Sequence, residues 1–448
     1  MTFEDLDLNK PLLNALNDLG YTQPTSIQAK AFTVMMSGKD VIGIAQTGTG
    51  KTLAYLLPCL QQFKFSKVKS LEPQVLILVP TRELVVQVVE EARKLMKYMN
   101  VTVGGIYGGS SINGQVTMVR GGLDILVATP GRLLDMVHKG ELRLKTTKKL
   151  IIDEVDEMLD LGFRFQLVKI FDEMPEKRQN LMFSATMTDK VEILINNFFN
   201  YPVKIEAAPT GTPLENIEQS AYYVPNFNTK IHLLKRLLHD HPEMSKVLVF
   251  SATKKLADLI YEEIDPEFPD KIGVVHANKA QSKRFDTVKL FHQGTYRVLV
   301  STDLIARGID ISEVTHVINI DTPDTAENYM HRIGRTGRAD KKGIAITFIT
   351  EQEKESQKLI EELMNTTLPI LPLPENLPIS DVLIDSELPQ IIMKSPVVKL
   401  PKKEVDNGAF HEKSAKRQKV NNKIRRRDKM QAKYGKPQTR GQKIKGKK

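Results

Sequence analysis

The sequence predicts an α/β protein in which two tandem, doubly wound parallel-sheet domains precede a basic C-terminal tail. Its 448 residues exceed what one hydrophobic core usually organises, so two globular domains are expected. Short runs rich in β-branched residues alternate with longer stretches of helical period, a pattern typical of parallel sheets covered by helices on both faces. Because this alternation occurs twice along the chain, we expect two such sheets.

The expected strands are short apolar runs. They lie at 41–45, 75–80, 125–130, 150–154 and 181–186 in the first domain, and at 247–252, 272–277, 298–302, 317–321 and 344–349 in the second. A turn-rich stretch separates the two series, and a proline-bearing stretch follows the second. The expected organisation is a first domain over 1–208, a linker over 209–216, a second domain over 217–370, an extension over 371–393 and a tail over 394–448.

The tail alone makes the chain basic. Residues 394–448 hold 20 Lys and Arg against 4 Asp and Glu, a net charge of +16, whereas the remaining residues hold 44 against 50, a net charge of −6. The tail has few apolar residues, so we expect it to be disordered when free and to bind nucleic-acid phosphate. A solvated, solubilising tail or a nuclear address are the alternatives.

Composition also limits the cellular setting. No apolar run approaches the roughly 20 residues that span a bilayer, and the first ten residues lack the features of a secretory signal. The single cysteine, Cys59, cannot form an intrachain disulfide and is expected to be a buried structural thiol. We therefore expect a soluble, cytoplasmic protein with a monomeric core and no membrane partner.

A glycine-rich loop after the first expected strand predicts a phosphate site. In AQTGTGKT (45–52) the glycines let backbone N–H groups surround an anion, and a helix begins at the same point. Lys51 is expected to reach the β- and γ-phosphates, and Thr52 to hold Mg²⁺. The strict P-loop pattern has glycine in place of Ala45, and a simple glycine-rich turn is the alternative. The expected nucleotide contacts are Ala45, Gln46, Thr47, Gly48, Thr49, Gly50, Lys51 and Thr52.

Carboxylates crowd the segment LIIDEVDEMLDLGF (150–163), where mutual repulsion disfavours them unless a cation lies among them. A P-loop enzyme needs a carboxylate at the end of a neighbouring strand to hold Mg²⁺, and Asp153 has that place. Glu154 can orient or deprotonate the water that attacks the γ-phosphate. For Glu157 and Asp160, a favourable position near a helix N-terminus is sufficient explanation.

In their order along the chain these motifs resemble the DEAD-box ATP-dependent RNA helicases, with the naming tetrapeptide written Asp-Glu-Val-Asp at 153–156. The resemblance extends from Phe3 to about residue 350 and includes PTRELVVQ (80–87), STDLIARGID (301–310) and HRIGRTGR (331–338). It implies two RecA-like domains that use ATP and Mg²⁺, close on RNA, and locally unwind RNA duplexes or remodel ribonucleoprotein.

The resemblance also implies roles for single residues. Phe3 stacks on adenine, Gln28 hydrogen-bonds to its edges, and Asp310 contacts the nucleotide. Arg335 and Arg338 act as arginine fingers on the γ-phosphate. The residues that couple ATP to RNA are Asp156, Ser184, Thr186 and His331. The residues that contact the RNA backbone are Pro80, Thr81, Arg82, Gly109, Thr129, Arg132 and Thr302.

Two other functions share this scaffold. A DNA-directed helicase or translocase is one, and the adenine element at Phe3 and Gln28 argues against it. A nucleic-acid-binding scaffold without turnover is the other, and it would normally lack Lys51, Glu154 or the fingers, all of which are present. Val155 replaces the alanine usual in the family, and we expect a tolerated repacking with ATPase activity retained.

Overall fold

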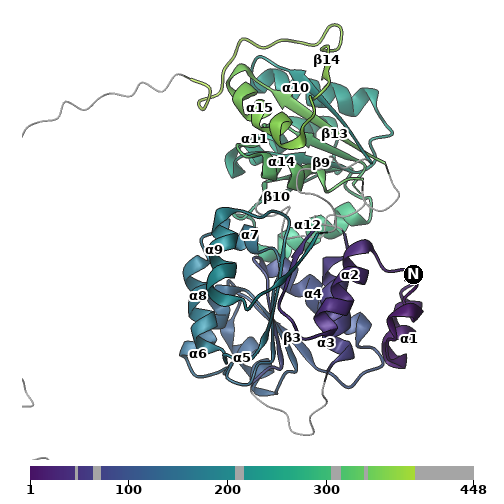
Figure 1. Ribbon diagram of the computed structural model, residues 1–448. Coiled ribbons are helices and arrows are strands. Elements are labelled where there is room, and N and C mark those ends of the chain that lie inside the picture. Colours follow the sequence, from purple (N-terminus) through teal and green to yellow (C-terminus); the bar gives the residue numbers. More distant parts are fainter. Residues whose placement is uncertain (46–48, 64–71, 207–215, 304–313, 338–341, 389–448) are drawn as a thin grey trace, which may run out of the picture. The chain divides into compact units, whose positions relative to one another are not determined.

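The computed structural model describes residues 1–45, 49–63, 72–206, 216–303, 314–337 and 342–388 (Figure 1). The chain divides into a compact unit, Met1–Leu388, and a second unit, Pro389–Lys448, which lies outside the described residues. The predictions for the linker over 209–216 fall almost entirely outside the described residues, and those for the tail over 394–448 fall wholly outside them.

Each half of the described chain is built on a seven-stranded, wholly parallel sheet. In spatial order the first sheet contains β3 (Val103–Ile106), β4 (Ile125–Ala128), β2 (Val75–Leu78), β5 (Lys149–Ile152), β6 (Gln179–Ser184), β1 (Val41–Ile44) and β7 (Val203–Glu206). The second contains β10 (Ile272–Val275), β11 (Val298–Ser301), β9 (Val247–Phe250), β12 (His316–Asn319), β13 (Gly343–Ile349), β8 (Ile217–Tyr223) and β14 (Ile370–Leu371). The predicted fold class is confirmed.

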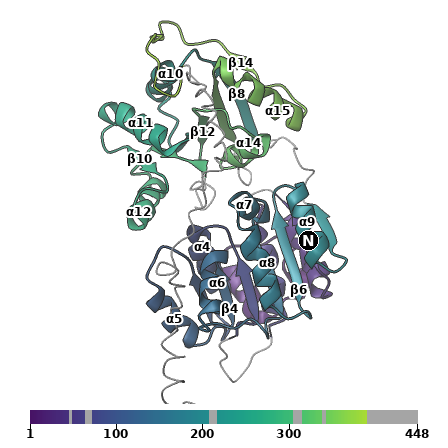
Figure 2. The ribbon, with the colours of Figure 1, turned by 90° about the vertical axis from the view of Figure 1, so that its left-hand side faces the viewer.

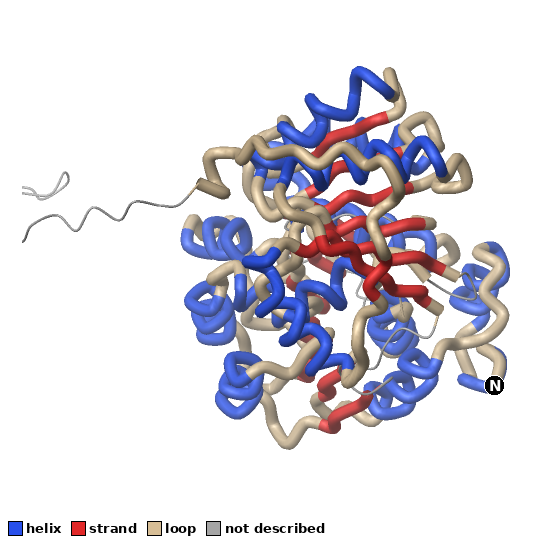
Figure 3. The backbone as a smooth tube through the Cα atoms, turned by 90° about the horizontal axis from the view of Figure 1, so that it is seen from above, coloured by secondary structure: helices blue, strands red, loops and turns tan. Residues whose placement is uncertain are grey.

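Helices flank the strands (Figure 3). Those of the first half are α1 (Lys10–Asp18), α2 (Ser26–Met36), α3 (Lys51–Gln61), α4 (Arg82–Leu95), α5 (Ile112–Arg120), α6 (Pro130–His138), α7 (Val155–Asp160), α8 (Arg164–Glu173) and α9 (Asp189–Phe198). Those of the second half are α10 (Phe227–Asp240), α11 (Lys254–Ile264), α12 (Gln281–His292), α14 (Ala326–Ile333) and α15 (Lys354–Met364). In the described part of the chain, every helix is too short or too polar to cross a membrane.

Alternate strand residues of the first sheet belong to two separate hydrophobic clusters. Ile77 and Ile151 pack with residues of α3 and α4, whereas Leu76 and Ile152 pack with residues of α6 and α8. Figure 1 shows α6 and α8 on one side of the strands and α3 and α4 on the other, and Figure 2 faces the layer of α6 and α8. Since successive strand residues face opposite sides, a strand buried on both faces must be apolar at every position. The runs that predicted these strands are apolar for this reason.

Four strands were missing from the prediction, namely β3, β7, β8 and β14. β7 lies at an edge of its sheet and reads VKIE, while β8 reads IEQSAYY. Five of their eleven residues are Lys, Glu, Gln or Ser, because one face of each strand is partly exposed. β3 contains two consecutive glycines, which weaken its apolar signal, and β14 has only two residues.

The segment after α15 packs against the second sheet. β14 pairs with β8, and Leu373, Leu377 and Ile384 pack on the hydrophobic cluster that contains α10. A carboxylate oxygen of Glu387 accepts a hydrogen bond of 2.6 Å from the backbone N–H of Phe227, at the start of α10. The proline-bearing stretch therefore continues the folded unit as far as Leu388.

Val155 is completely buried in the cluster between the first sheet and α8. Replacing it by alanine removes two methyl groups, so we expect the free energy of unfolding to fall by about 2 kcal/mol in urea titrations. RNA-stimulated ATPase activity of Val155→Ala should stay within about tenfold of wild type, because the change is one of packing. A gain in activity larger than this would mean that valine impairs the site.

Candidate functional site

The loop between β1 and α3 brings a buried lysine to the carboxyl edge of the first sheet. Gly50 has a φ of 86°, and a Cβ atom at this position would overlap the side-chain amide of Gln28. Lys51 follows at the start of α3 with 7% of its surface exposed, and its Nζ has no hydrogen-bond partner among the described residues. The Lys51 ammonium group therefore has hydrogen-bonding capacity free for an anion, as the predicted phosphate contact requires. Gln46, Thr47 and Gly48 lie outside the described residues.

The predicted acidic pair lies at the same edge, directly after β5. Asp153 is 7% exposed, and its Oδ1 accepts a 3.0 Å hydrogen bond from the backbone N–H of Glu154. Glu154 adopts a left-handed backbone conformation with φ of 52°, which is strained for a residue with a side chain and is often found at functional sites. One of its carboxylate oxygens, Oε2, is buried without a hydrogen-bond partner in the described chain. The strained turn thus holds a carboxylate oxygen that can still accept a hydrogen bond from a bound ligand or water.

Burial controls the charge of these two carboxylates. It raises the pKa of Asp153, and the positive charge of Lys51 only partly offsets this effect. Burial likewise raises the pKa of Glu154 to about 7, with Asp153 and Asp156 adding to the rise while Lys51 and Arg335 oppose it. A carboxylate with a pKa near neutrality is suited to proton transfer.

The donor set fits a nucleotide-bound Mg²⁺ rather than a metal held by protein alone. Among the described residues there is no group of three or more His, Cys, Asp or Glu side chains that could hold a metal ion. Mg²⁺ in nucleotide sites commonly takes one or two protein ligands, and phosphate oxygens and waters supply the rest. Asp153, with the Thr52 hydroxyl, would meet this need beside the phosphate-binding Lys51.

Asp156 connects α7 to the turn after β6. Its Oδ2 accepts hydrogen bonds from the backbone N–H groups of Ala185 (3.1 Å) and Thr186 (2.9 Å) and from the Thr186 hydroxyl (3.0 Å). His331 Nε2 lies 4.0 Å from the same oxygen, and the Ser184 hydroxyl donates to the carbonyl of Thr186. Burial alone would raise the pKa of Asp156, but His331, Lys51 and the Thr186 bonds lower it. The four predicted coupling residues are therefore brought together.

The arginine-rich motif that begins in the last turn of α14 supplies a second cation. Arg335 is 3% exposed, and its positive charge acts on Glu154 strongly enough to oppose the rise of that residue's pKa. Arg332, which the prediction left without a role, donates to both carboxylate oxygens of Asp303, at 2.6 and 2.8 Å. Arg338 and Asp310 lie outside the described residues.

The two residues of the predicted adenine element are both buried. Phe3 is 3% exposed and packs in the hydrophobic cluster of α1–α4. The side-chain amide of Gln28 accepts from the Thr25 N–H at 2.9 Å and donates to the Gly50 carbonyl at 3.1 Å. Gln28 is thus tied to the phosphate loop, and the adenine contacts of both residues stay predictions.

The residues predicted to contact RNA in the first half form a connected group. Thr81 caps α4 by accepting from the Leu84 N–H. Arg132 donates to Gln115 Oε1 at 3.0 Å and to the Ser110 carbonyl at 3.1 Å. Gly109 has a φ of 75°, and a Cβ atom there would overlap the Arg82 guanidinium.

The remaining members of the predicted set lie at strand ends. Pro80 is buried after β2, Thr129 is 7% exposed after β4, and Thr302 is 7% exposed after β11. An RNA contact by any of these side chains remains a prediction.

Sequence reasoning missed an ion pair between the two halves of the described chain. Arg284 Nη2 lies 2.9 Å from Glu83 Oε1, and both side chains are more than 90% buried. Nearby, Arg82 Nη1 lies 3.4 Å from Gln281 Oε1. The sequence shows that Gln281 and Arg284 are three positions apart. It does not show that their partners are Arg82 and Glu83, which are about 200 positions away.

The raised pKa of Glu154 predicts a pH-dependent stability. Between the usual glutamate pKa of 4.5 and the folded value of about 7, the native protein binds a proton that the unfolded chain has released. The free energy of unfolding contributed by this group therefore falls as the pH rises through that window. We expect Glu154→Gln, which cannot titrate, to gain on the order of 1–3 kcal/mol relative to wild type between pH 5 and pH 8. Urea unfolding of both nucleotide-free proteins measures this, and a pH-independent difference would contradict it.

Comparison with known proteins shows which family the chain resembles. The family model for the DEAD/DEAH box helicase matches residues 25–194, and that for the helicase conserved C-terminal domain matches residues 229–340. ATP-dependent RNA helicase RhlB of Shewanella sediminis is 38% identical over 375 residues, which are 82% of this chain and 85% of RhlB. DEAD-box ATP-dependent RNA helicase CshA of Bacillus cereus is 40% identical over 361 residues, 80% of this chain and 67% of CshA.

Solved structures agree with these sequence matches. S. cerevisiae Dbp5 bound to RNA and ADP BeF3 has a TM-score of 0.75 at 28% identity, covering 83% of this chain and 96% of Dbp5. Mss116 bound to ssRNA and UDP-BeF also has a TM-score of 0.75 at 28% identity, covering 84% of this chain and 80% of Mss116. With the P-loop lysine, the Asp-Glu-Val-Asp turn and the arginine motif, these matches show that the chain belongs to the DEAD-box ATP-dependent RNA helicases.

Proposed function

We propose that this protein hydrolyses ATP as the Mg²⁺ complex when RNA is bound, and uses the cycle to open short RNA duplexes or remodel ribonucleoprotein. The observation that carries the proposal is the environment of Glu154. Lys51 from the first half and Arg335 from the second both act on its carboxylate. A site that takes cations from two sheets is complete only when the two halves meet.

Each side chain has a separate task in this reaction. Lys51 binds the phosphates, while Asp153 and Thr52 would hold Mg²⁺, which would supply positive charge beside them. Glu154 orients the attacking water and accepts its proton. Arg335 stabilises the charge that develops on the γ-phosphoryl oxygens, a contribution of about 10³- to 10⁵-fold in related phosphoryl transfers.

RNA binding and ATP binding are expected to strengthen each other. The predicted RNA contacts include Arg82 and Arg132 in the first half and Thr302 in the second, so one strand can bridge both halves. Any ligand that binds the closed form preferentially raises the affinity of another ligand that does the same. The contacts of Asp156 with Thr186 and His331 support this coupling, because they connect the acidic turn of the first half to α14 of the second. Loss of the γ-phosphate after hydrolysis weakens closure and releases the RNA.

The contacts favour backbone recognition over sequence readout. Hydroxyl and guanidinium groups suit phosphates and 2′-OH groups, and contacts of this kind bind single strands without base preference. The basic tail would add affinity that falls with salt. We place this activity in the cytoplasm, on a monomeric core.

A single set of assays tests the proposal. Steady-state ATP hydrolysis is measured with no nucleic acid, with single-stranded RNA and with DNA of the same sequence, and unwinding is measured on a short RNA duplex. We expect stimulation by RNA of at least tenfold and little by DNA. Equal stimulation by DNA would favour a DNA-directed helicase, and binding without hydrolysis would favour a scaffold.

A further inference from the structure

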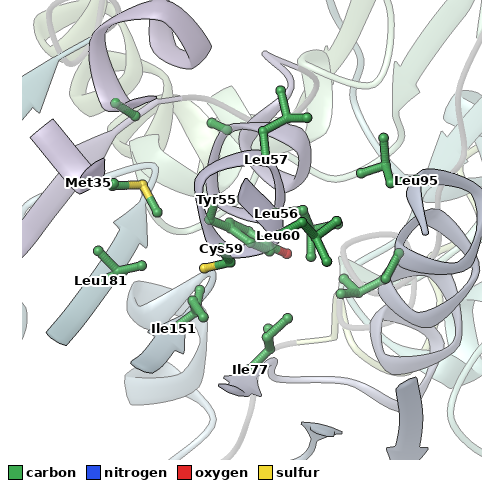
Figure 4. Packing of buried hydrophobic residues seen from close by; sticks show 14 of the residues in the cluster. Met35, Tyr55, Leu56, Leu57, Cys59, Leu60, Ile77, Leu95, Ile151 and Leu181 are labelled. Carbon is green, nitrogen blue, oxygen red and sulfur yellow. The ribbon is translucent and has the colours of Figure 1, made fainter. Parts of the chain in front are cut away.

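Tyr55 is a buried tyrosine in the helix that follows the phosphate loop. It lies on α3 three residues after Thr52, hence on the same helix face, and none of its surface is exposed. Its ring is 5.4 Å from the ring of Phe183 on β6, at an interplanar angle of 52°. Figure 4 shows it within the apolar cluster, with Leu56, Cys59 and Leu60 of the same helix.

The position of this ring is closely determined by its neighbours. A Cβ atom at Gly43 would come within 2.6 Å of the Phe183 ring, so only glycine on β1 leaves Phe183 its place. Phe183 in turn supports Tyr55. The tyrosine hydroxyl can therefore move little, and its direction is set by the apolar core beneath it.

The hydroxyl of Tyr55 is the polar exception in this cluster. It is buried, and it has no hydrogen-bond partner of normal geometry among the described residues. Burial raises its pKa well above the usual value, and the carboxylates of Asp153 and Glu91 raise it further. The Thr52 side chain lies close enough to act in the opposite direction. A buried hydroxyl without a partner is destabilising by about 1–3 kcal/mol, and phenylalanine would fill the same space without that loss.

Asp153 has acceptor capacity that this hydroxyl can use. The backbone N–H of Glu154 occupies one position on Oδ1, and a carboxylate offers about four lone-pair directions. The Tyr55 and Asp153 side chains lie close enough to interact through a hydrogen bond. Carboxylates that hold metals are commonly fixed by a hydrogen bond from a neighbouring group, and loss of that group typically weakens metal binding by about 10- to 100-fold.

We propose that Tyr55 is a positioning residue whose hydroxyl donates to Asp153 and fixes the face that this carboxylate presents to nucleotide-bound Mg²⁺. The inference rests on the proposed function, since it assumes that Asp153 holds the metal. Because the hydroxyl is fully buried in the apolar cluster, its assigned action is on Asp153 and not on the nucleotide itself. Its effect should therefore appear as metal coupling, not as loss of nucleotide contacts.

The test compares wild type with Tyr55→Phe, which removes a single oxygen from a buried ring. The affinity for a non-hydrolysable ATP analogue is measured with Mg²⁺ in excess and again with EDTA. The ratio of the two affinities is the metal coupling. We expect this ratio to fall by about tenfold in Tyr55→Phe, with the EDTA affinity unchanged. Mn²⁺ bound to the protein–analogue complex, followed by electron paramagnetic resonance, should weaken by the same factor.

Tyr329→Phe is the matched control. Tyr329 is equally buried, but it lies on α14 and donates to Gln219 Oε1 at 2.9 Å. Its variant loses a satisfied hydrogen bond and should be less stable with unchanged metal coupling. Tyr55→Phe should be as stable as nucleotide-free wild type, or more so.

The outcomes separate the two hypotheses. If wild type shows strong coupling and Tyr55→Phe lies within twofold of it, the positioning role is wrong and the metal site stands. If wild-type affinity does not respond to Mg²⁺, the proposed metal site is wrong, and the role of Tyr55 with it. A drop in stability without a change in coupling would mean that the hydroxyl is only structural.

Discussion

Glu154→Gln is expected to lower the turnover number of RNA-stimulated ATP hydrolysis by about 10²- to 10⁴-fold while ATP and RNA still bind. Glutamine keeps the size and hydrogen-bonding reach of the side chain but cannot accept the proton of the attacking water. One oxygen of Glu154 has no partner within the described residues, so the replacement disturbs little else. The left-handed backbone at this position depends on the turn, and it should persist. Single-turnover hydrolysis with RNA, alongside equilibrium binding of both ligands, measures the effect.

Asp160→Asn provides the control for this variant. Asp160 belongs to the same acidic segment and ends the same short helix, but it is exposed and pairs at 3.2 Å with Lys190. An exposed ion pair of this kind contributes at most about 1 kcal/mol, so turnover should change less than twofold. If Glu154→Gln turned over as fast as Asp160→Asn, Glu154 would have no part in activating water.

The nucleotide end of the site could be predicted because its chemistry is local in sequence. Lys51 follows β1 and Asp153 follows β5, and parallel strands end at the same edge of their sheet. Each residue therefore needed only a strand and the turn after it. The apolar runs of the central strands were equally readable, because burial on both faces requires them.

Features that depend on distant partners could not be predicted. Nothing in the residues around Glu83 or Arg284 shows that they form a buried pair, since charged residues at such positions usually face solvent. In the sequence Tyr55 looks like one more apolar residue of its helix. A role for its hydroxyl is suggested only when the fold brings Asp153, after β5, close to it. Strands β7 and β8 were missed for a related reason, because partial exposure removes the apolar pattern.

Arg335→Lys is expected to reduce RNA-stimulated turnover by about 10³-fold or more, with ATP affinity little changed. Lysine keeps the charge but loses the planar fork that can hold two phosphoryl oxygens at once. We expect the rate to fall and the affinity to stay because Lys51, which also acts on Glu154, still supplies the cation of the first half. An equal fall in affinity and in rate would instead make Arg335 a ground-state ligand of ATP.

A second arginine in the same half separates chemistry from folding. Arg297 donates to the backbone carbonyls of Met244, Leu238 and His241 at 2.7–2.9 Å, and so closes the end of α10. Arg297→Lys should lower the stability of this half while each folded molecule turns over normally. Arg335→Lys should leave the stability little changed and lower the turnover. The contrast follows from what each guanidinium meets. Arg297 donates to carbonyls within its own half. Arg335 acts on the Glu154 carboxylate, which follows a strand of the first sheet. Loss of the Arg335 guanidinium should therefore affect the reaction only when ATP and RNA bring both halves together.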